Sequence, residues 1–423
     1  MAGRLLSACG SGLRGGLGAL GLASATAVAV PATYLATLTA LGLARNGSPA
    51  VGTTTSTSGR EREPRRIAVC VPAHDEEAVI AETVTALTAQ DYPHDRFEVH
   101  VVADNCSDAT VELATRAGAT AHDRRAPDEP GKGAALNWLH DRLDGFDAFV
   151  IVDADTLVDP DFLAEIDRAL DRGHRVVQGF YGVLEPEQSP AVALRYAALA
   201  ARHHLRPLGR RALGGSCGLF GNGMAFDASV LETRRWSGHL VEDAEFQLEL
   251  LLDGEIVDYV PSARLAAEMP TSLDESETQH QRWELGRAQI ARRFLPELIR
   301  LIGRGGPRPR HVYVDAALDQ VTPPISALAA ANGAVTAVGL ASWVAGARSG
   351  RLVTAVGLGS IGVLGLHTVA ALRSVGAPAS MYRALAAAPR LVVWKLGLLK
   401  DVSRRPDDVS WTRTQRNADA RVP

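Results

Sequence analysis

The chain has 423 residues, of which 46% are apolar and only 5% aromatic, and it carries 44 Lys and Arg against 48 Asp and Glu. The net charge of −4 argues against a protein that coats nucleic acid, so we expect no nucleic-acid partner. Four cysteines without C-x-x-C spacing argue against a structural zinc site and against a disulfide-stapled fold. A mean hydropathy close to zero is expected of a soluble body joined to a few apolar spans.

The first charge-free run indicates an N-terminal membrane anchor. No Asp, Glu, Lys or Arg occurs between Arg14 and Arg45, and a helix crosses the hydrocarbon core in about 20 residues. The small residues at 23–25 resemble a signal-peptide cleavage site, but the apolar run continues far past them. We therefore predict that residues 1–45 form an uncleaved transmembrane anchor. The Gly-, Ser- and Thr-containing stretch at 46–64 is predicted to be a flexible linker.

Two further charge-free runs, at about 320–347 and 352–372, predict a membrane hairpin. Buried helices of a soluble domain are the alternative for all three runs, because their Ala and Gly content makes them only moderately hydrophobic. The hairpin belongs to a C-terminal membrane region at 301–423, which also contains a predicted interfacial helix at 381–400 and a polar tail. Lys and Arg cluster beside the central body, which predicts a multi-pass plasma-membrane protein whose catalytic domain is cytoplasmic.

The central body at 65–300 alternates strand and helix signals, as a parallel α/β sheet does. In such a sheet, ligands bind beyond the carboxyl ends of the strands, so the polar residues that follow the strands should converge. Apolar runs typical of buried strands lie at 67–72, 98–103 and 148–152, and helical spacing of apolar residues lies at 76–90, 109–117 and 135–143.

Acidic residues follow each of these predicted strands, at 74–77, 104–108 and 153–155. Carboxylates that meet at a ligand site repel one another. Their presence is explained if they bind a divalent cation or accept hydrogen bonds from a base and a ribose. An Asp-x-Asp pair such as Asp153 and Asp155 offers the hard oxygen ligands that Mg²⁺ or Mn²⁺ prefers. Helix N-capping produces the same pair, so the position after the third strand is what favours a metal site.

Seven short motifs follow one another along this body and carry a resemblance to a known family. In this order they resemble the membrane-bound family-two glycosyltransferases of the GT-A fold, in the cellulose, chitin and hyaluronan synthase-like branch with a Gln-x-x-Arg-Trp motif. The resemblance covers about residues 65–300 and implies an α/β nucleotide-sugar-binding domain with a mainly parallel sheet. The motifs are Val71-Pro72-Ala73-His74-Asp75-Glu76, the segment 104–108, the segment 131–137, Asp153-Ala154-Asp155, Gly221-Asn222-Gly223, Val241-Glu242-Asp243 and Gln279-His280-Gln281-Arg282-Trp283.

The resemblance implies a role for each motif residue. Asp243 would be the catalytic base and Asp155 the ligand of a Mg²⁺ or Mn²⁺ ion. Contacts with the nucleotide sugar are implied for Pro72, Ala73, Asp75, Glu76, Asp104, Lys132, Asn137, Asp153 and Arg282. Contacts with the acceptor are implied for Gly221, Asn222, Glu242, Gln279 and Trp283. Two positions depart from the family pattern, since Asp75 stands where Asn is usual and Val241 where Thr is usual.

Three of these roles have simpler alternatives. Glu242 and Asp243 also form the acidic first-turn pair that a helix dipole favours. Trp283 could stack on an acceptor sugar or anchor the chain at a membrane interface. Lys132 could be a solvated turn residue.

The predicted function is inverting transfer of a hexose or N-acetylhexosamine from a nucleotide sugar, UDP-linked by expectation, at the cytoplasmic membrane face. The acceptor would be a glycan or a lipid-linked molecule. Processive polysaccharide synthesis is one interpretation, and a non-processive enzyme that acts on a lipid or a short glycan is the close alternative. A non-catalytic sugar-nucleotide-binding component of an export complex is a third. A homo-oligomer or an export partner fits all three interpretations.

Overall fold

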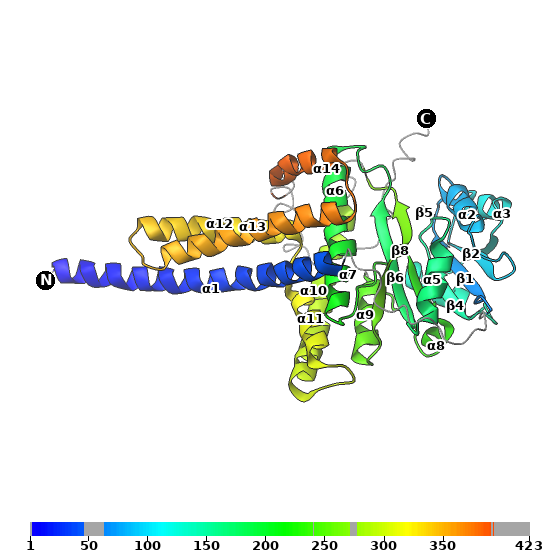
Figure 1. Cartoon of the computed structure of the whole chain (residues 1–423), viewed down its shortest axis with the longest axis horizontal. Helices are drawn as coiled ribbons and strands as arrows, with labels where there is room; N and C mark the ends of the chain where they lie inside the picture. Colours follow the sequence, from blue (N-terminus) through cyan, green and yellow to red (C-terminus); the bar gives the residue numbers. More distant parts are fainter. Residues whose placement is uncertain (1, 46–62, 240, 271–276, 391, 393–423) are drawn as a thin grey trace.

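The computed structural model describes residues 2–45, 63–239, 241–270, 277–390 and 392, and for 2–18, 20, 45 and 277–282 it describes the backbone alone. An α/β domain lies at one end of the molecule, and three long helices project together from one side of it (Figure 1). The predicted linker at 46–64 lies outside the described residues except for its last two positions. The predicted helix at 381–400 is described only at 381–390 and 392, and the tail after it lies outside the described residues.

One eight-stranded mixed sheet forms the centre of the domain, in the order β3-β2-β1-β4-β7-β6-β8-β5. Strands β1 to β4 pair in parallel, whereas β4 with β7, β6 with β7 and β5 with β8 pair antiparallel. The strands are β1 (Ile67–Ala73), β2 (Phe97–Asp104), β3 (Thr120–Arg124), β4 (Ala148–Ile151), β5 (Thr156–Val158), β6 (Val176–Val183), β7 (Met224–Asp227) and β8 (Val257–Ala267).

Helices cover both faces of the sheet, because strands such as β1 are apolar on both sides. Ile67, Val69 and Val71 of β1 join one core cluster with α2 (Ile80–Thr88), α3 (Thr110–Arg116) and α5 (Phe162–Asp171). Ala68 and Cys70 point to the opposite face. There they join a second cluster with α4 (Lys132–His140), α8 (Ala228–Leu231) and α9 (Glu242–Leu252).

The predicted strands and helices of the parallel half are all present, with boundaries that shift by up to four residues. The helix expected at 76–90 is shorter, because the polar residues before Ile80 form turns instead. Strand β3 was not predicted, since it lies at an edge of the sheet and Arg124 is its only buried side chain. The antiparallel pairs β4–β7, β6–β7 and β5–β8 join residues far apart in the sequence, so no local sequence pattern predicts them.

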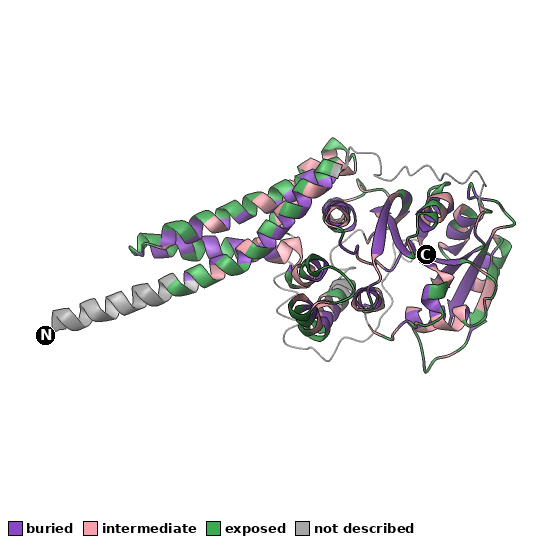
Figure 2. Ribbon diagram, turned by 60° about the horizontal axis from the view of Figure 1, so that its bottom comes forward, coloured by how far each residue is buried: buried purple, intermediate pink, exposed green. Residues whose placement is uncertain are grey.

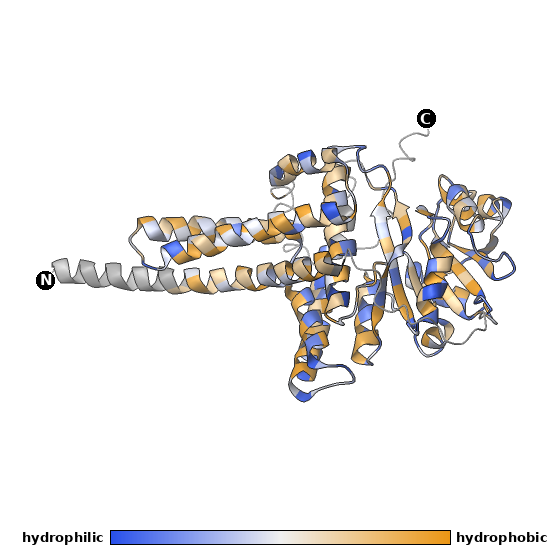
Figure 3. Ribbon diagram, viewed as in Figure 1, coloured by the Kyte–Doolittle hydropathy of each residue, from blue (hydrophilic) through white to orange (hydrophobic). Residues whose placement is uncertain are grey.

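The three projecting helices are α1 (Ala2–Arg45), α12 (Ile325–Val344) and α13 (Gly350–Ser374). They contact one another (Figures 1 and 2), and their described residues are apolar on average (Figure 3). Gly21–Ala44, Ile325–Val344 and Gly350–Ser374 are each long and apolar enough to span a membrane. Inside the bundle, the Thr39 hydroxyl and His367 Nδ1 lie 2.7 Å apart, so a polar pair joins α1 to α13.

A layer of helices connects the sheet to this bundle (Figure 1). Tyr34 of α1 donates a 2.9 Å hydrogen bond to Asp315 of α11. A Cβ at Gly209 of α7 would lie 2.4 Å from the Leu38 carbonyl oxygen, so the two backbones touch there. The layer consists of α6 (Pro190–Ala200), a π-helical turn (Ala201–Leu205), α7 (Arg206–Ala212), α10 (Glu277–Arg304) and α11 (Arg310–Val321), with α14 (Ala379–Ala384) and a 3-10 turn (Leu385–Ala387) at its edge.

Candidate active site

The acidic loops after β1 and β2 meet at one edge of the sheet, as the parallel topology requires. Asp75 has a positive φ of 52°, a conformation that Asp and Asn tolerate better than most residues. Asp75 therefore fits where the family pattern has Asn, and it accepts a 2.6 Å hydrogen bond from the Ser107 backbone N–H. His74 Nδ1 lies 2.6 Å from the Asp104 carbonyl oxygen and joins the same two loops.

Pro72 and Ala73 end β1 at this edge, and the side chain of Glu76 is buried behind them. The Glu76 backbone N–H donates to the Thr110 hydroxyl at 2.8 Å. These three residues therefore fix the path of the loop that leaves β1.

Asp104 is buried and bonded to Arg124, a residue that the sequence analysis did not identify. The Arg124 guanidinium donates to one Asp104 oxygen, and the Gly131 N–H donates to the other at 3.0 Å. Asp104 thereby connects β2 to the loop before α4. A carboxylate has about four lone-pair sites, so contact with a nucleobase or ribose stays a prediction for Asp104. Arg124 lies 20 residues away in an edge strand, and no spacing pattern links the two.

Asp75, Cys106 and Asp108 bring three potential metal-ligand atoms within 4.8 Å of one another. A hard divalent cation prefers oxygen ligands, and burial raises the pKa of the Cys106 thiol to about 11. Asp108 already accepts hydrogen bonds from the Glu77 N–H and from Thr110. This cluster therefore joins two loops and does not fit a magnesium or manganese ion.

Lys132 connects the loop after β4 to the Gly221 loop. Its ammonium donates to Asp153 and to the Gly221 carbonyl oxygen, both at 2.5 Å. Desolvation lowers the pKa of Lys132, but Asp153 and Glu242 more than offset this, and the net shift is upward. Lys132 is thus a fixed cation at the centre of the acidic site and not a solvated turn residue.

Asn222 occupies a different place from the one expected of an acceptor ligand. It is fully buried, and its Oδ1 accepts a 3.1 Å hydrogen bond from the Asp153 N–H. Its Nδ2 donates to the Thr156 hydroxyl at 2.7 Å. An acceptor cannot reach this amide, so we correct its role to internal support of the turn that carries Asp153 and Asp155.

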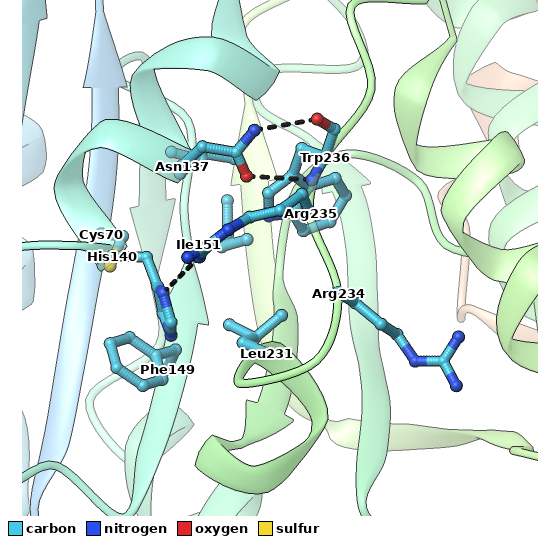
Figure 4. Close-up of a pocket in the computed structure, with 10 residues that line it drawn as sticks. Cys70, Asn137, His140, Phe149, Ile151, Leu231, Arg234, Arg235 and Trp236 are labelled. Carbon is cyan, nitrogen blue, oxygen red and sulfur yellow. Dashed lines mark hydrogen bonds between the residues drawn. The ribbon is translucent and has the colours of Figure 1, made fainter.

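Asn137 also supports the site from behind. Its amide makes two 2.9 Å hydrogen bonds to the backbone N–H and carbonyl of Trp236 (Figure 4). A Cβ at Gly133 would lie 2.4 Å from the Ser237 carbonyl oxygen, so only glycine allows α4 this approach. These bonds position the loop that leads to Glu242. The Asn137 amide keeps one N–H and one lone pair, so its contact with the nucleotide sugar stays a prediction.

Glu242 and Asp243 begin α9, as the helical pattern predicted. Both are half-buried. Burial, with the Asp243 charge second, raises the pKa of Glu242 to about 7. Burial also raises the pKa of Asp243, against the opposing effects of the Ala244 N–H, 2.8 Å away, and of Lys132. A carboxylate with a raised pKa accepts a proton more readily near neutral pH, which suits a general base.

Asp243 lies next to the Gly221 loop. A Cβ added to Gly221 would be 3.4 Å from an Asp243 oxygen and 3.5 Å from Lys132 Nζ. The structure therefore brings together Lys132, Asp153, Gly221, Glu242 and Asp243 from four separate motifs.

Helix α10, which carries the last motif, packs against the residue that precedes α9. A Cβ at Gly286 would lie 2.7 Å from Val241, so the helix packs directly against the residue before Glu242. The side chain of Trp283 is 40% exposed. Gln279 and Arg282 lie on the same helix as predicted, but their side chains are outside the described residues.

Asp155 is half-buried and lies in the turn between β4 and β5. The Thr156 hydroxyl lies 3.4 Å from one of its oxygens. With Asp153 two residues before it, this turn presents two carboxylates and no thiol or imidazole. That donor chemistry fits Mg²⁺ or Mn²⁺.

Comparison with known proteins identifies the fold and the family. A family model described as "Glycosyltransferase like family 2" matches residues 64–286, more than half of the chain. One similar structure is that of the mannosyltransferase PcManGT from Pyrobaculum calidifontis, solved in complex with GDP-Man and Mn2+. The alignment covers 90% of this chain and 99% of that chain, with a TM-score of 0.53 and 19% sequence identity. This likeness shows the fold, which is GT-A with a mixed sheet.

Two curated proteins are similar in sequence. The probable glycosyltransferase YdaM of Bacillus subtilis is 26% identical over 265 residues, which cover 57% of this chain and 59% of that protein. Glucomannan 4-beta-mannosyltransferase 7 of Arabidopsis thaliana is 23% identical over 248 residues, 55% of this chain and 45% of that protein. The chain therefore spans about half the length of these relatives.

Proposed function

The chain belongs to the glycosyltransferase-like family 2, and from this premise we propose that it moves a sugar from a nucleotide sugar to an acceptor hydroxyl with inversion. One observation carries the proposal. The half-buried carboxylate of Asp243, whose pKa is raised, lies beside the loop that Lys132 holds to Asp153. A proton acceptor and a cation that can meet a phosphate are thus held side by side.

In the proposed reaction, Asp243 accepts the proton of the acceptor hydroxyl. The acceptor oxygen forms a bond to the anomeric carbon while the bond from that carbon to the diphosphate breaks, and a nucleoside diphosphate leaves. Asp243 acts as a base only in its ionised form. Because its pKa is raised, the ionised carboxylate binds a proton more strongly than an ordinary aspartate does. Glu242 beside it would orient the acceptor.

The donor would lie over the acidic edge of the sheet. Asp75 and Asp104 face the nucleoside in this proposal, and Lys132 and Arg282 meet the diphosphate. Asp155 would hold a Mg²⁺ or Mn²⁺ ion, whose charge offsets the negative charge of the departing group. The likeness to a mannosyltransferase solved with GDP-Man adds GDP-mannose to the UDP-sugars as a candidate donor.

The acceptor side would face the membrane. Three helices that can span a bilayer project from one side of the domain. Arg300, Arg304, Arg308 and Arg310 precede the second span in the sequence, which supports the cytoplasmic placement of residues 65–300. The described spans are few for the wall of a polymer channel, so we propose a lipid-linked or short-glycan acceptor. Processive chain growth is the alternative that the exposed Trp283 favours.

Release of nucleoside diphosphate by the full chain in detergent tests this function. The donor panel is GDP-mannose, UDP-glucose and UDP-N-acetylglucosamine with Mn²⁺. We expect release from one donor that stops in EDTA. Tight binding of a donor with no release, under every acceptor tried, would instead identify a non-catalytic sugar-nucleotide-binding protein.

A further inference from the structure

A pocket lined by four arginines lies between the catalytic domain and the membrane helices. Arg202, Arg206 and Arg210 come from the π-helical turn and α7, and Arg287 comes from α10. Asp319 of α11 is the one acidic residue among the described lining residues. Of the residues predicted to contact the nucleotide sugar, those whose side chains are described do not line this pocket, so we treat it as separate from the proposed donor site.

Arg206 is buried here with fewer partners than a guanidinium needs. Its side chain is 7% exposed, and its ion pair to Asp319 is long at 3.8 Å. Within the described part of the chain, its Nε donates to no acceptor. Burial, with the neighbouring Arg202 and Arg210, lowers the pKa of Arg206. A buried donor left without an acceptor is costly, and an anion in the pocket would remove that cost.

The charges that line the pocket do not balance. Four guanidinium groups and one carboxylate, that of Asp319, line it among the described residues. Arg210 is paired with Asp315 at 2.8 Å and with Asp319 at 3.3 Å. Outside the lining, Glu284 acts on Arg287, and Arg202 acts on Asp243. Burial, with the Arg202 charge as a second cause, lowers the pKa of Arg287 to about 10.

The lining of the pocket adjoins the proposed base on one side and residues that lead to the membrane helices on the other. Phe220 and Ala244 line it, and they directly adjoin Gly221 and Asp243. On the other side, Asp319 lies six residues before α12, and Asp315 accepts the hydrogen bond from Tyr34 of the first span. A group bound here would have its charge in the pocket and any apolar chain beside α1 and α12.

We propose that this pocket binds the phosphate group of a membrane lipid acceptor and thereby places a hydroxyl of its headgroup at Asp243. The inference rests on the proposed function, whose acceptor it specifies. Arginine suits this ligand, because its planar fork donates two parallel hydrogen bonds to a phosphate. Basic pockets beside membrane helices bind lipid headgroups by the same chemistry.

The phosphate takes no part in the bond changes. The headgroup hydroxyl gives its proton to Asp243, its oxygen forms the bond to the anomeric carbon, and the nucleoside diphosphate leaves. The lipid phosphate stays esterified and bound by the arginines throughout.

Binding of phosphatidylinositol to the full chain in dodecyl maltoside micelles tests the proposal, with diacylglycerol as the matched lipid that lacks a phosphate. We expect Arg206→Gln and the more exposed Arg202→Gln each to weaken phosphatidylinositol binding by about 10–100-fold, as the loss of a charged hydrogen bond does. Arg211→Gln is the control, because Arg211 lies on the same helix but pairs with Asp258.

Equal binding of the two lipids, or unchanged binding in both variants, would overturn the proposal. Inorganic phosphate that binds as tightly as the lipid would show a site for free phosphate and would also overturn it. Nucleotide-sugar binding, measured separately, should be the same in Arg206→Gln and in the parent, and a matching loss there would move the arginines to the donor site. If no donor is bound or turned over while the arginine-dependent lipid binding persists, the proposed function fails and the lipid site stands.

Discussion

Charged groups lie on two sides of Glu242 and Asp243, at the start of α9, and the two sides differ in how many of these groups have partners of opposite charge. On the sheet side, Asp104 is bonded to Arg124 and Gly131, and Asp153 to Lys132. On the side of the projecting helices, the pocket lining has four guanidinium groups and one carboxylate among the described residues, and Arg206 Nε has no acceptor there. The carboxylates on the first side are already paired within the protein, whereas an anionic ligand would supply partners for the arginines on the second side. The following changes separate the two sides.

The largest effect is expected at the carboxylate between them. Asp243→Asn should lower the rate of sugar transfer by about 10²–10⁴-fold, the usual contribution of general-base catalysis. Donor affinity should persist, because the amide is nearly isosteric and one negative charge near a diphosphate is removed. Transfer kinetics and donor binding measure the two effects. Asp253→Asn, at the other end of α9, is the control. A parent-like rate in Asp243→Asn would rule out this base.

Removal of the metal ligand should act on the sheet side alone. Asp155→Ala should weaken metal-dependent donor binding by roughly 10–100-fold, the loss that even outer-shell partners of a metal cause. EDTA should produce the same loss in the parent chain. Isothermal titration with donor and Mn²⁺ measures it. Asp159→Ala, an exposed neighbour that pairs with Arg264, should bind as the parent does. Full donor affinity in EDTA would contradict the metal site.

Trp283 tests the acceptor side. Trp283→Ala should raise the acceptor requirement by about 2–10-fold, because an aromatic contact of about 0.5–1.5 kcal/mol is lost, while donor binding is kept. Product length then separates the two acceptor hypotheses, since a processive enzyme would make shorter chains and a single-addition enzyme would not. Trp343→Ala, an exposed tryptophan at the far end of α12, is the control. A donor-binding defect in Trp283→Ala would count against an acceptor role.

The smallest effect concerns stability and pH. Glu242 has a folded pKa raised to about 7, so its ionisation disfavours the folded state as the pH rises from its unfolded value near 4.5 to about 7. Glu242→Gln should therefore melt about 2–4 °C above the parent at pH 8, and the difference should vanish near pH 4. Thermal unfolding at both pH values measures it. The exposed Glu112→Gln should show no such gain, and a destabilised Glu242→Gln at pH 8 would refute the sign.

The parallel half of the fold could be predicted because its information is local. Apolar runs of five or six residues, each followed by a polar loop, identified β1, β2 and β4 and the edge where their loops meet. Strand β3 and the antiparallel strands could not be predicted, since their pairing depends on residues up to about 110 positions apart. The start of α9 at Glu242 followed from helical spacing alone.

The predicted site was limited in the same way. Motif residues identified the acidic loops and Asp243, but they did not distinguish ligand contacts from internal supports. Asn222 lies in a motif, and yet it is fully buried and its amide bonds to Asp153 and Thr156. Arg124 and the arginine pocket carry no motif, because their residues come from distant elements that only the fold brings together.

The configuration of the product tests the central claim of a single displacement assisted by Asp243 most directly. The full chain in detergent would receive an α-linked nucleotide sugar and a lipid acceptor, and the one-bond carbon–hydrogen coupling at the anomeric carbon would be read by NMR. We expect a β-linked product. An α-linked product would contradict the mechanism, because retention cannot arise from one in-line attack by a hydroxyl that Asp243 deprotonates.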